Sequence, residues 1–136
     1  MAELTNFEMI ERAKKALNPR ELYLGNSAGD VACALLSSKG NLYLGVCIDI
    51  SSGIGFCAEH SAIAAMITAG ETSIAKVVAV WGPGTVLPPC GRCRELMYEI
   101  DPANLECTEV ILGEHSAIKL KDLLPHPYHE VWSEKR

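Results

Sequence analysis

The 136-residue chain lacks the features that would direct it to a membrane or to a nucleic acid. It has no apolar run approaching the ~20 residues that a membrane-spanning helix requires, and its first residues show no basic stretch followed by an apolar one. It also lacks an excess of positive charge, since 12 Lys and Arg stand against 17 Asp and Glu without any long basic run. We therefore expect a cytoplasmic protein that binds neither a membrane nor a polynucleotide.

The composition is that of an ordinary globular protein, with 49% apolar and 21% charged residues. At this length roughly two thirds of the unfolded surface can be buried, so we expect one domain over residues 1–136. The chain contains 6 cysteines, but a core of this size does not need disulfide bonds to fold. Reduced thiols, some of them holding a metal, are the expectation.

Hydrophobic periodicity predicts alternating helices and strands. Helices are expected at residues 7–17, 58–69, 90–100 and 120–124, and strands at residues 31–36, 42–50, 76–81 and 110–112. The first two strands read as a hairpin, and the later helices can serve as crossovers between parallel strands. The pattern predicts an α/β fold with helices packed on a partly parallel sheet.

Two cysteines lie at the start of the helix predicted over residues 90–100. Cys90 and Cys93 are three residues apart, which is the spacing of a zinc chelate on one helix face, and Pro89 fixes the entry to the helix. The same spacing also occurs in thioredoxin-like redox pairs and in half of a structural zinc site. This motif alone therefore leaves its chemistry open.

A second motif supplies another thiol and a carboxylate. Cys57 and Glu59 share the first turn of an apolar helix, and helical side chains lean toward the N-terminus, so both can reach one metal ion. A zinc ion with three protein ligands keeps a fourth position for water, whose pKa falls toward ~7, and a carboxylate can collect the released proton. The pattern predicts catalytic zinc held by Cys57, Cys90 and Cys93, with Glu59 as the acid/base.

The C-A-E motif at residues 57–59 and the P-C-x-x-C motif at residues 89–93 resemble those of the zinc-dependent cytidine and blasticidin S deaminases that use three cysteines. The resemblance extends from about residue 31 to residue 132. It implies a three-layer α/β/α fold with a mixed five-stranded sheet. It also implies hydrolysis of the 4-amino group of a free cytosine nucleoside, such as cytidine or 2′-deoxycytidine, by a homotetramer with shared active sites.

The same resemblance assigns roles around a nucleoside substrate. The backbone N–H of Ala58 would donate to the pyrimidine carbonyl, and the backbone carbonyl of Pro88 would accept from the departing amine. Glu59 would carry a proton to N3 of the ring and then to the amine. Phe56 and Trp132 are candidate contacts of the base or covers of the pocket, with Trp132 reaching a neighbouring subunit.

Some positions depart from the pattern of cytidine deaminases. His60 stands where those enzymes carry an Arg that hydrogen-bonds the ligand thiolates, and it could donate to a thiolate instead or bind zinc itself. Cys47 and Asp49 stand where they carry Asn and Glu, so ribose recognition is open, although Asp49 could accept from a sugar hydroxyl. Gly29 stands where relatives that bind cytidine often have Phe, and small residues near the pocket, those of residues 51–55 included, suggest room for a substituent on the exocyclic nitrogen or for a non-ribose sugar.

Several hypotheses remain open at this point. The first is deamination of cytidine or 2′-deoxycytidine, and the second is deamination of blasticidin S or of other modified cytosine nucleosides. A non-catalytic alternative has a structural zinc ion with His60 as the fourth ligand, in which case Glu59 only stabilises a helix N-terminus. A redox protein that uses Cys90 and Cys93 without zinc is the remaining alternative.

Overall fold

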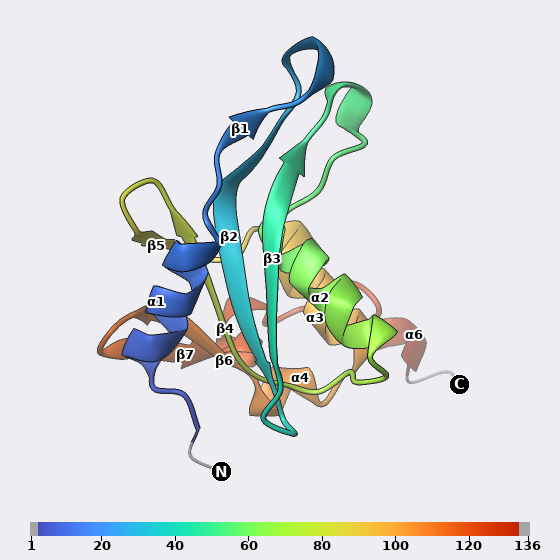
Figure 1. Ribbon diagram of the computed structural model, residues 1–136. Coiled ribbons are helices and arrows are strands. Elements are labelled where there is room, and N and C mark those ends of the chain that lie inside the picture. Colours follow the sequence, from blue (N-terminus) through green and yellow to red (C-terminus); the bar gives the residue numbers. More distant parts are fainter. Residues whose placement is uncertain (1–2, 134–136) are drawn as a thin grey trace.

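The computed structural model describes residues 3–133, which form a mixed sheet with helices on both faces (Figure 1). The helices are α1 (Asn6–Ala16), α2 (Ala58–Thr68), α3 (Gly91–Ile100), α4 (Asn104–Cys107), α5 (Leu120–Leu123) and α6 (Glu130–Ser133). The strands are β1 (Arg20–Glu21), β2 (Ser27–Ser37), β3 (Leu42–Asp49), β4 (Ile74–Trp81), β5 (Thr85–Leu87), β6 (Glu109–Gly113) and β7 (Ser116–Lys119). Two 3-10 turns, η1 (Tyr23–Gly25) and η2 (Ser51–Gly53), complete the described elements.

Strand β2 organises the sheet by pairing antiparallel with β1, β3 and β4. Strand β4 continues the sheet in parallel to β6, with α3 in the connection between them, and β6 forms an antiparallel hairpin with β7. The mixed sheet and the predicted hairpin of β2 and β3 are thus confirmed. The expectation of five strands is wrong, because the described sheet has seven. Strands β1 and β5 span only two and three residues, too few to show a hydrophobic period.

The side-chain alternation of β2 divides the core into two layers. Leu36 belongs to a cluster with α1 on one face of the sheet, whereas Leu35 belongs to a cluster with α2 and α3 on the other. The buried members of the α1 layer are Met9, Ile10, Ala13, Ala32, Ala34, Leu36, Val78, Val80 and Ile111. This arrangement confirms the three-layer α/β/α fold.

Helix α2 lies unusually close to β3, which fixes the position of the C-A-E motif. A Cβ atom at Gly45 of β3 would stand 2.3 Å from the backbone nitrogen of Ala62 and 2.6 Å from the carbonyl oxygen of Ala58. One turn along, the hydroxyl of Ser61 donates to the carbonyl of Val46 at 2.7 Å. Only glycine allows this approach, and the N-terminus of α2 is held against the sheet as a result.

A buried amide joins the helix that carries the P-C-x-x-C motif to the sheet. Asn104 is fully buried, and its Oδ1 accepts from the backbone N–H of Ile74 at the start of β4 (2.9 Å). Its Nδ2 donates to the carbonyls of Thr72 (3.0 Å) and Met97 (2.9 Å), the latter on α3. Three hydrogen bonds from one side chain thus connect α3 with β4 and the loop before it.

Replacing Asn104 with Ala is expected to lower the free energy of unfolding by about 3 kcal/mol, because buried backbone groups would lose partners at about 1–3 kcal/mol each. Urea denaturation followed by circular dichroism measures the change. Glu114→Ala, at an exposed position, is the control and should stay within about 0.5 kcal/mol of the parent. A loss of less than about 1 kcal/mol in Asn104→Ala would show that these hydrogen bonds contribute little.

No helix within residues 3–133 is both long enough and apolar enough to cross a lipid bilayer.

Candidate metal centre and active site

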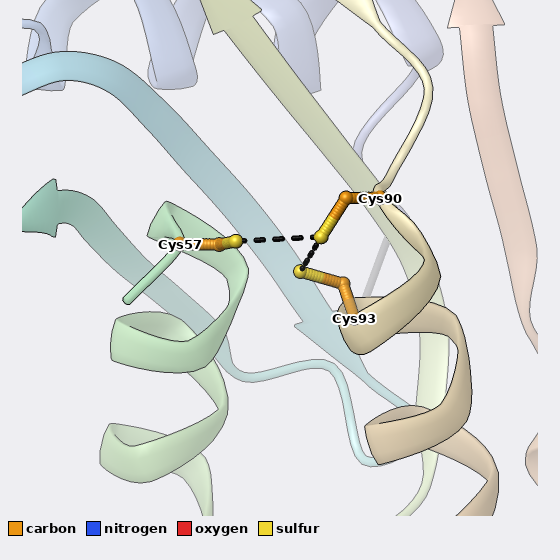
Figure 2. A group of neighbouring side chains, drawn as sticks. All are labelled: Cys57, Cys90 and Cys93. Atoms are coloured by element: carbon orange, nitrogen blue, oxygen red, sulfur yellow. Dashed lines mark hydrogen bonds between the residues drawn. The ribbon is translucent and has the colours of Figure 1, made fainter. Parts of the chain in front are cut away.

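The three predicted zinc ligands come together at the N-termini of two neighbouring helices (Figure 2). Cys57 is the N-cap residue of α2, Cys90 is the N-cap residue of α3, and Cys93 lies in the first turn of α3. The Sγ atoms of Cys57 and Cys90 are 3.4 Å apart, and those of Cys90 and Cys93 are 3.5 Å apart. All three are free thiols, and their sulfur atoms lie within 4.8 Å of one another.

This donor set fits a zinc ion. Tetrahedral zinc with Zn–S bonds of about 2.3 Å places its sulfur ligands about 3.8 Å apart, close to the separations seen here. Thiolates are among the ligands that zinc favours. Cys93 is buried, while Cys57 and Cys90 are accessible from the cavity described below, so the site is closed on one side only. The positions of the three thiols are those that the sequence predicts.

Backbone amides at the start of α3 stabilise one of the thiolates. Burial by itself raises the pKa of Cys90, but hydrogen bonds from the backbone N–H groups of Cys93 and Arg92 and from the neighbouring thiols lower that pKa overall. Burial raises the pKa of Cys57 and, more strongly, that of Cys93, where the nearby Glu59 carboxylate adds to the effect. The three sulfur atoms therefore differ in which hydrogen-bond donors support them.

Glu59 is a buried carboxylate beside the thiols. It lies in the first turn of α2 and is only 5% exposed. Burial raises the pKa of its carboxyl, while hydrogen bonds with its own backbone N–H and with Cys93 partly offset that rise. A buried carboxyl group of this kind can take up a proton in one step of a reaction and release it in the next. The structure thus places an acid/base group next to the candidate metal centre.

A cavity of about 770 Å³ opens over the thiols and is large enough for a nucleoside. Its lining includes the residues predicted to contact the base or its amine, namely Ala58, Pro88 and Phe56. Cys57, Cys90 and Glu59 form another part of its wall. The structure therefore brings two of the three predicted metal ligands, the acid/base residue and most of the predicted substrate contacts to one cavity, with Cys93 buried behind its wall.

Trp132 is the exception among the predicted substrate contacts. It lies on α6 and packs edge-on against Tyr128, with ring centroids 4.8 Å apart, and against His129. It is not among the residues that line the cavity of its own chain. Its contact with a neighbouring subunit stays a prediction.

Sequence reasoning missed one of the two loops that line the cavity, the η1 region. Leu24 and Asn26 from the η1 region and Ser51 from η2 line it, although these loops are 25 residues apart in the sequence. The side chain of Asn26 accepts from the backbone N–H of Ser51 at 2.9 Å and so joins the two loops. Nothing in the sequence pairs these two segments.

Cys47 and Asp49 also line the cavity, where they form a second polar cluster. The Sγ of Cys47 accepts from the backbone N–H of Val31 at 3.3 Å and contacts the Oδ2 of Asp49 at 3.4 Å. A carboxylate oxygen of Asp30 lies within 4.8 Å of both side chains. Asp49 therefore faces the cavity with a second carboxylate, that of Asp30, close behind it, although Asp30 does not line the cavity itself.

The interpretation of Gly29 as extra room in the pocket is wrong. Gly29 does not line the cavity, and a Cβ atom there would stand 2.0 Å from the carbonyl oxygen of Asn18. The backbone N–H of Asn18 donates to the carbonyl of Gly29 at 3.1 Å, and Gly29 has a positive φ of 83°. This glycine is explained by the close approach of the chain after α1 and not by the substrate.

A family model of the cytidine and deoxycytidylate deaminase zinc-binding region matches residues 7–109, which include both motifs. The chain belongs to this deaminase family. It is 33% identical over 118 residues to a cytidine deaminase of Halalkalibacterium halodurans, which covers 82% of this chain and 87% of the relative. It is 28% identical over 134 residues to a blasticidin-S deaminase of Bacillus cereus, covering 90% and 91% of the two chains.

The fold agrees with this membership. The crystal structure of cytidine deaminase from Mycobacterium leprae matches with a TM-score of 0.75 at 28% identity, over 91% of this chain and 100% of that one. The predicted resemblance to the deaminases is therefore confirmed, and membership points to a hydrolytic deaminase. The family model describes a zinc-binding region, and the cluster of Cys57, Cys90 and Cys93 also suits zinc.

The deaminase site contains His60 where the predicted pattern has Arg. The Nδ1 of His60 lies 3.5 Å from the Sγ of Cys93, and its ring stacks on Phe56 with centroids 6.2 Å apart. Burial lowers the pKa of His60, and the positive charge of Arg92 lowers it further. A neutral imidazole is therefore favoured beside the buried thiol.

Proposed function

We propose that this protein is a zinc-dependent hydrolytic deaminase of free cytosine nucleosides, converting cytidine or 2′-deoxycytidine to the uridine compound and ammonia. The observation that carries the proposal is the buried carboxylate of Glu59, which shares one nucleoside-sized cavity with Cys57 and Cys90. The cytidine deaminase relatives support the same reaction. A structural zinc site would not need an acid/base group in a cavity of this size.

Cys57, Cys90 and Cys93 would hold the zinc ion. When bound, zinc supplies Lewis-acid activation of water near neutral pH. The partial positive charges of the two helix N-termini offset part of the negative charge that three thiolates introduce. The three thiolates and the two helix N-termini would therefore hold a divalent cation without a fourth anionic ligand from the protein.

The residues around the cavity would bind the base and move its protons. The backbone N–H of Ala58 would donate to the pyrimidine carbonyl and orient C4 toward Glu59. As water adds at C4, Glu59 would take one of its protons and deliver it to N3, and would then move the proton of the new C4 hydroxyl to the exocyclic nitrogen. The C4–N bond then breaks, and the carbonyl of Pro88 would accept from the departing ammonia.

A free nucleoside is the proposed substrate form, because the chain carries a net charge of −5 and a strand of nucleic acid needs a basic groove. We also propose a homotetramer. The exposed side chains of Tyr128, Val131 and Trp132 on and beside α6 would then be covered by a neighbouring copy.

A second candidate is the deamination of modified cytosine nucleosides such as blasticidin S. Cys47 and Asp49 would present a thiol and a carboxylate to the sugar side of the proposed substrate. The Asp30 carboxylate, within 4.8 Å of both, adds negative charge that would favour amino or guanidino substituents over a plain ribose. The blasticidin-S deaminase relative supports this candidate. Both candidates share the reaction at C4 and differ only in the sugar.

Absorbance-monitored turnover of cytidine, 2′-deoxycytidine, blasticidin S and an N4-acylcytidine by zinc-loaded protein tests both candidates. Loss of the cytosine absorbance for cytidine supports the first, and a higher kcat/KM for blasticidin S supports the second. No turnover of any of the four by protein that holds zinc through four protein ligands would contradict the proposal and favour a structural zinc ion.

Asp49→Ala is expected to raise the KM for cytidine about tenfold and to leave kcat within about twofold, because a hydrogen bond to a sugar hydroxyl contributes to binding rather than to chemistry. Steady-state kinetics of the purified variant measure both constants. Asp122→Ala, which changes an exposed carboxylate outside the cavity, is the matched control. An unchanged KM would remove Asp49 from the sugar-binding residues.

A further inference from the structure

The three thiols differ in the hydrogen-bond donors that face them. Cys90 caps α3 and receives the backbone N–H groups of Arg92 and Cys93. Cys93 lies within the first turn of the same helix and is fully buried. The side chain that can donate an N–H to Cys93 is the imidazole of His60, whose Nδ1 lies 3.5 Å from the Sγ of Cys93.

A buried thiolate on a metal requires such a donor. A complex of three thiolates with one divalent cation carries a net negative charge. A hydrogen bond to a ligand sulfur disperses part of this charge and also fixes the rotamer of the cysteine. The N···S separation of 3.5 Å is a normal length for a hydrogen bond to sulfur. Because Cys93 is out of reach of water, the imidazole takes the place that solvent would fill at an exposed thiolate.

We infer that His60 is a positioning residue of the proposed zinc centre, donating its Nδ1–H to the Cys93 thiolate while its ring supports Phe56 in the cavity wall. The ring contact is a near-parallel stack, with an interplanar angle of 22°. One side chain thus connects a metal ligand with the surface that faces the substrate. The inference rests on the proposed zinc centre and adds to it a residue that touches neither the reacting atoms nor the metal.

The geometry argues against His60 as a fourth metal ligand. In a tetrahedral site with three sulfur ligands, a nitrogen ligand would stand about 3.6 Å from every sulfur. His60 Nδ1 lies 3.5 Å from Cys93, but His60 does not belong to the group of ligand atoms within 4.8 Å of one another, so at least one of the other two sulfur atoms is farther away than that. A donor to one thiolate satisfies the observed placement, whereas a ligand would have to lie close to all three sulfur atoms.

Variants of His60 test this role in the full-length protein. His60→Ala removes the donor, whereas His60→Asn keeps an N–H near the position of Nδ1. We expect His60→Ala to weaken zinc binding about tenfold and to shift the sulfur-to-cobalt charge-transfer band of the Co(II)-substituted protein, and His60→Asn to recover most of both. His115→Ala, at a highly exposed histidine, is the control that should match the parent protein.

Two results would overturn the inference. An unchanged zinc affinity and charge-transfer band in His60→Ala would show that the imidazole does not support Cys93. X-ray absorption of the zinc protein that shows an imidazole ligand would show that His60 binds the metal directly. Either result is distinct from failure of the proposed function, which the parent protein reveals by binding no zinc or by leaving cytidine unchanged.

Discussion

Glu59→Gln is expected to lower kcat for cytidine about 10²- to 10⁴-fold while zinc stays bound, because the amide cannot accept or release the proton that the reaction moves. Glu59 is well placed for this work. It is 5% exposed, lines the cavity, and has a carboxyl pKa raised by burial. Gln has nearly the same volume, so the packing of α2 against β3 is kept. The loss should therefore appear in kcat and leave KM for cytidine within a few fold of that of the parent.

Steady-state kinetics, combined with metal analysis of the same preparation, measure this effect. Glu71→Gln is the matched control, because Glu71 is also buried but bonds to Tyr43 and Asn41 away from the cavity. The control should keep its kcat even where its stability falls. A Glu59→Gln protein with a kcat near that of the parent would assign the proton transfers to another group.

Cys93→Ala is expected to abolish stoichiometric zinc binding and, with it, turnover. Two thiols remain, and one of them is the accessible Cys90, so the buried side of the site loses its ligand. Metal analysis after gel filtration and competition with a chromophoric chelator measure the loss. Cys107→Ser is the control, since the Cys107 thiol bonds to the carbonyl of Ile74 and lies outside the group of three.

The same variant separates zinc chemistry from redox chemistry. A redox protein built on Cys90 and Cys93 would cycle between dithiol and disulfide without metal. The proposed centre instead predicts one zinc ion per chain in the parent and none in Cys93→Ala. A variant that retains one zinc ion with unchanged affinity would remove Cys93 from the ligand set.

The metal centre could be predicted from the sequence because its parts are local. The spacing of Cys90 and Cys93 places both at one helix start, and Cys57 and Glu59 share one turn of α2. Helix boundaries followed from caps that the sequence shows, such as Thr5, whose hydroxyl and backbone bond reciprocally with Glu8 in α1. Interactions within one helical turn depend on residues three or four positions apart, so the sequence alone can predict them.

The features that sequence reasoning missed depend on segments distant along the chain. Strands β1 and β5 are too short to carry a period and exist because β2 and β4 offer them partners. The interpretation of Gly29 as room in the pocket is wrong because a side chain at this position would collide with the backbone of Asn18. The pairing of Asn26 with Ser51 joins two loops of the cavity wall through one hydrogen bond. Contacts of this kind follow from the fold and become visible only with it.

The most direct test of the central claim is to remove the metal with a chelator, return one equivalent of zinc, and follow cytidine at each stage. The account predicts no turnover by the metal-free protein and restored turnover after zinc is returned, with uridine and ammonia formed in equal amounts. Full turnover by the metal-free protein, or none by protein that has regained its zinc, would contradict it.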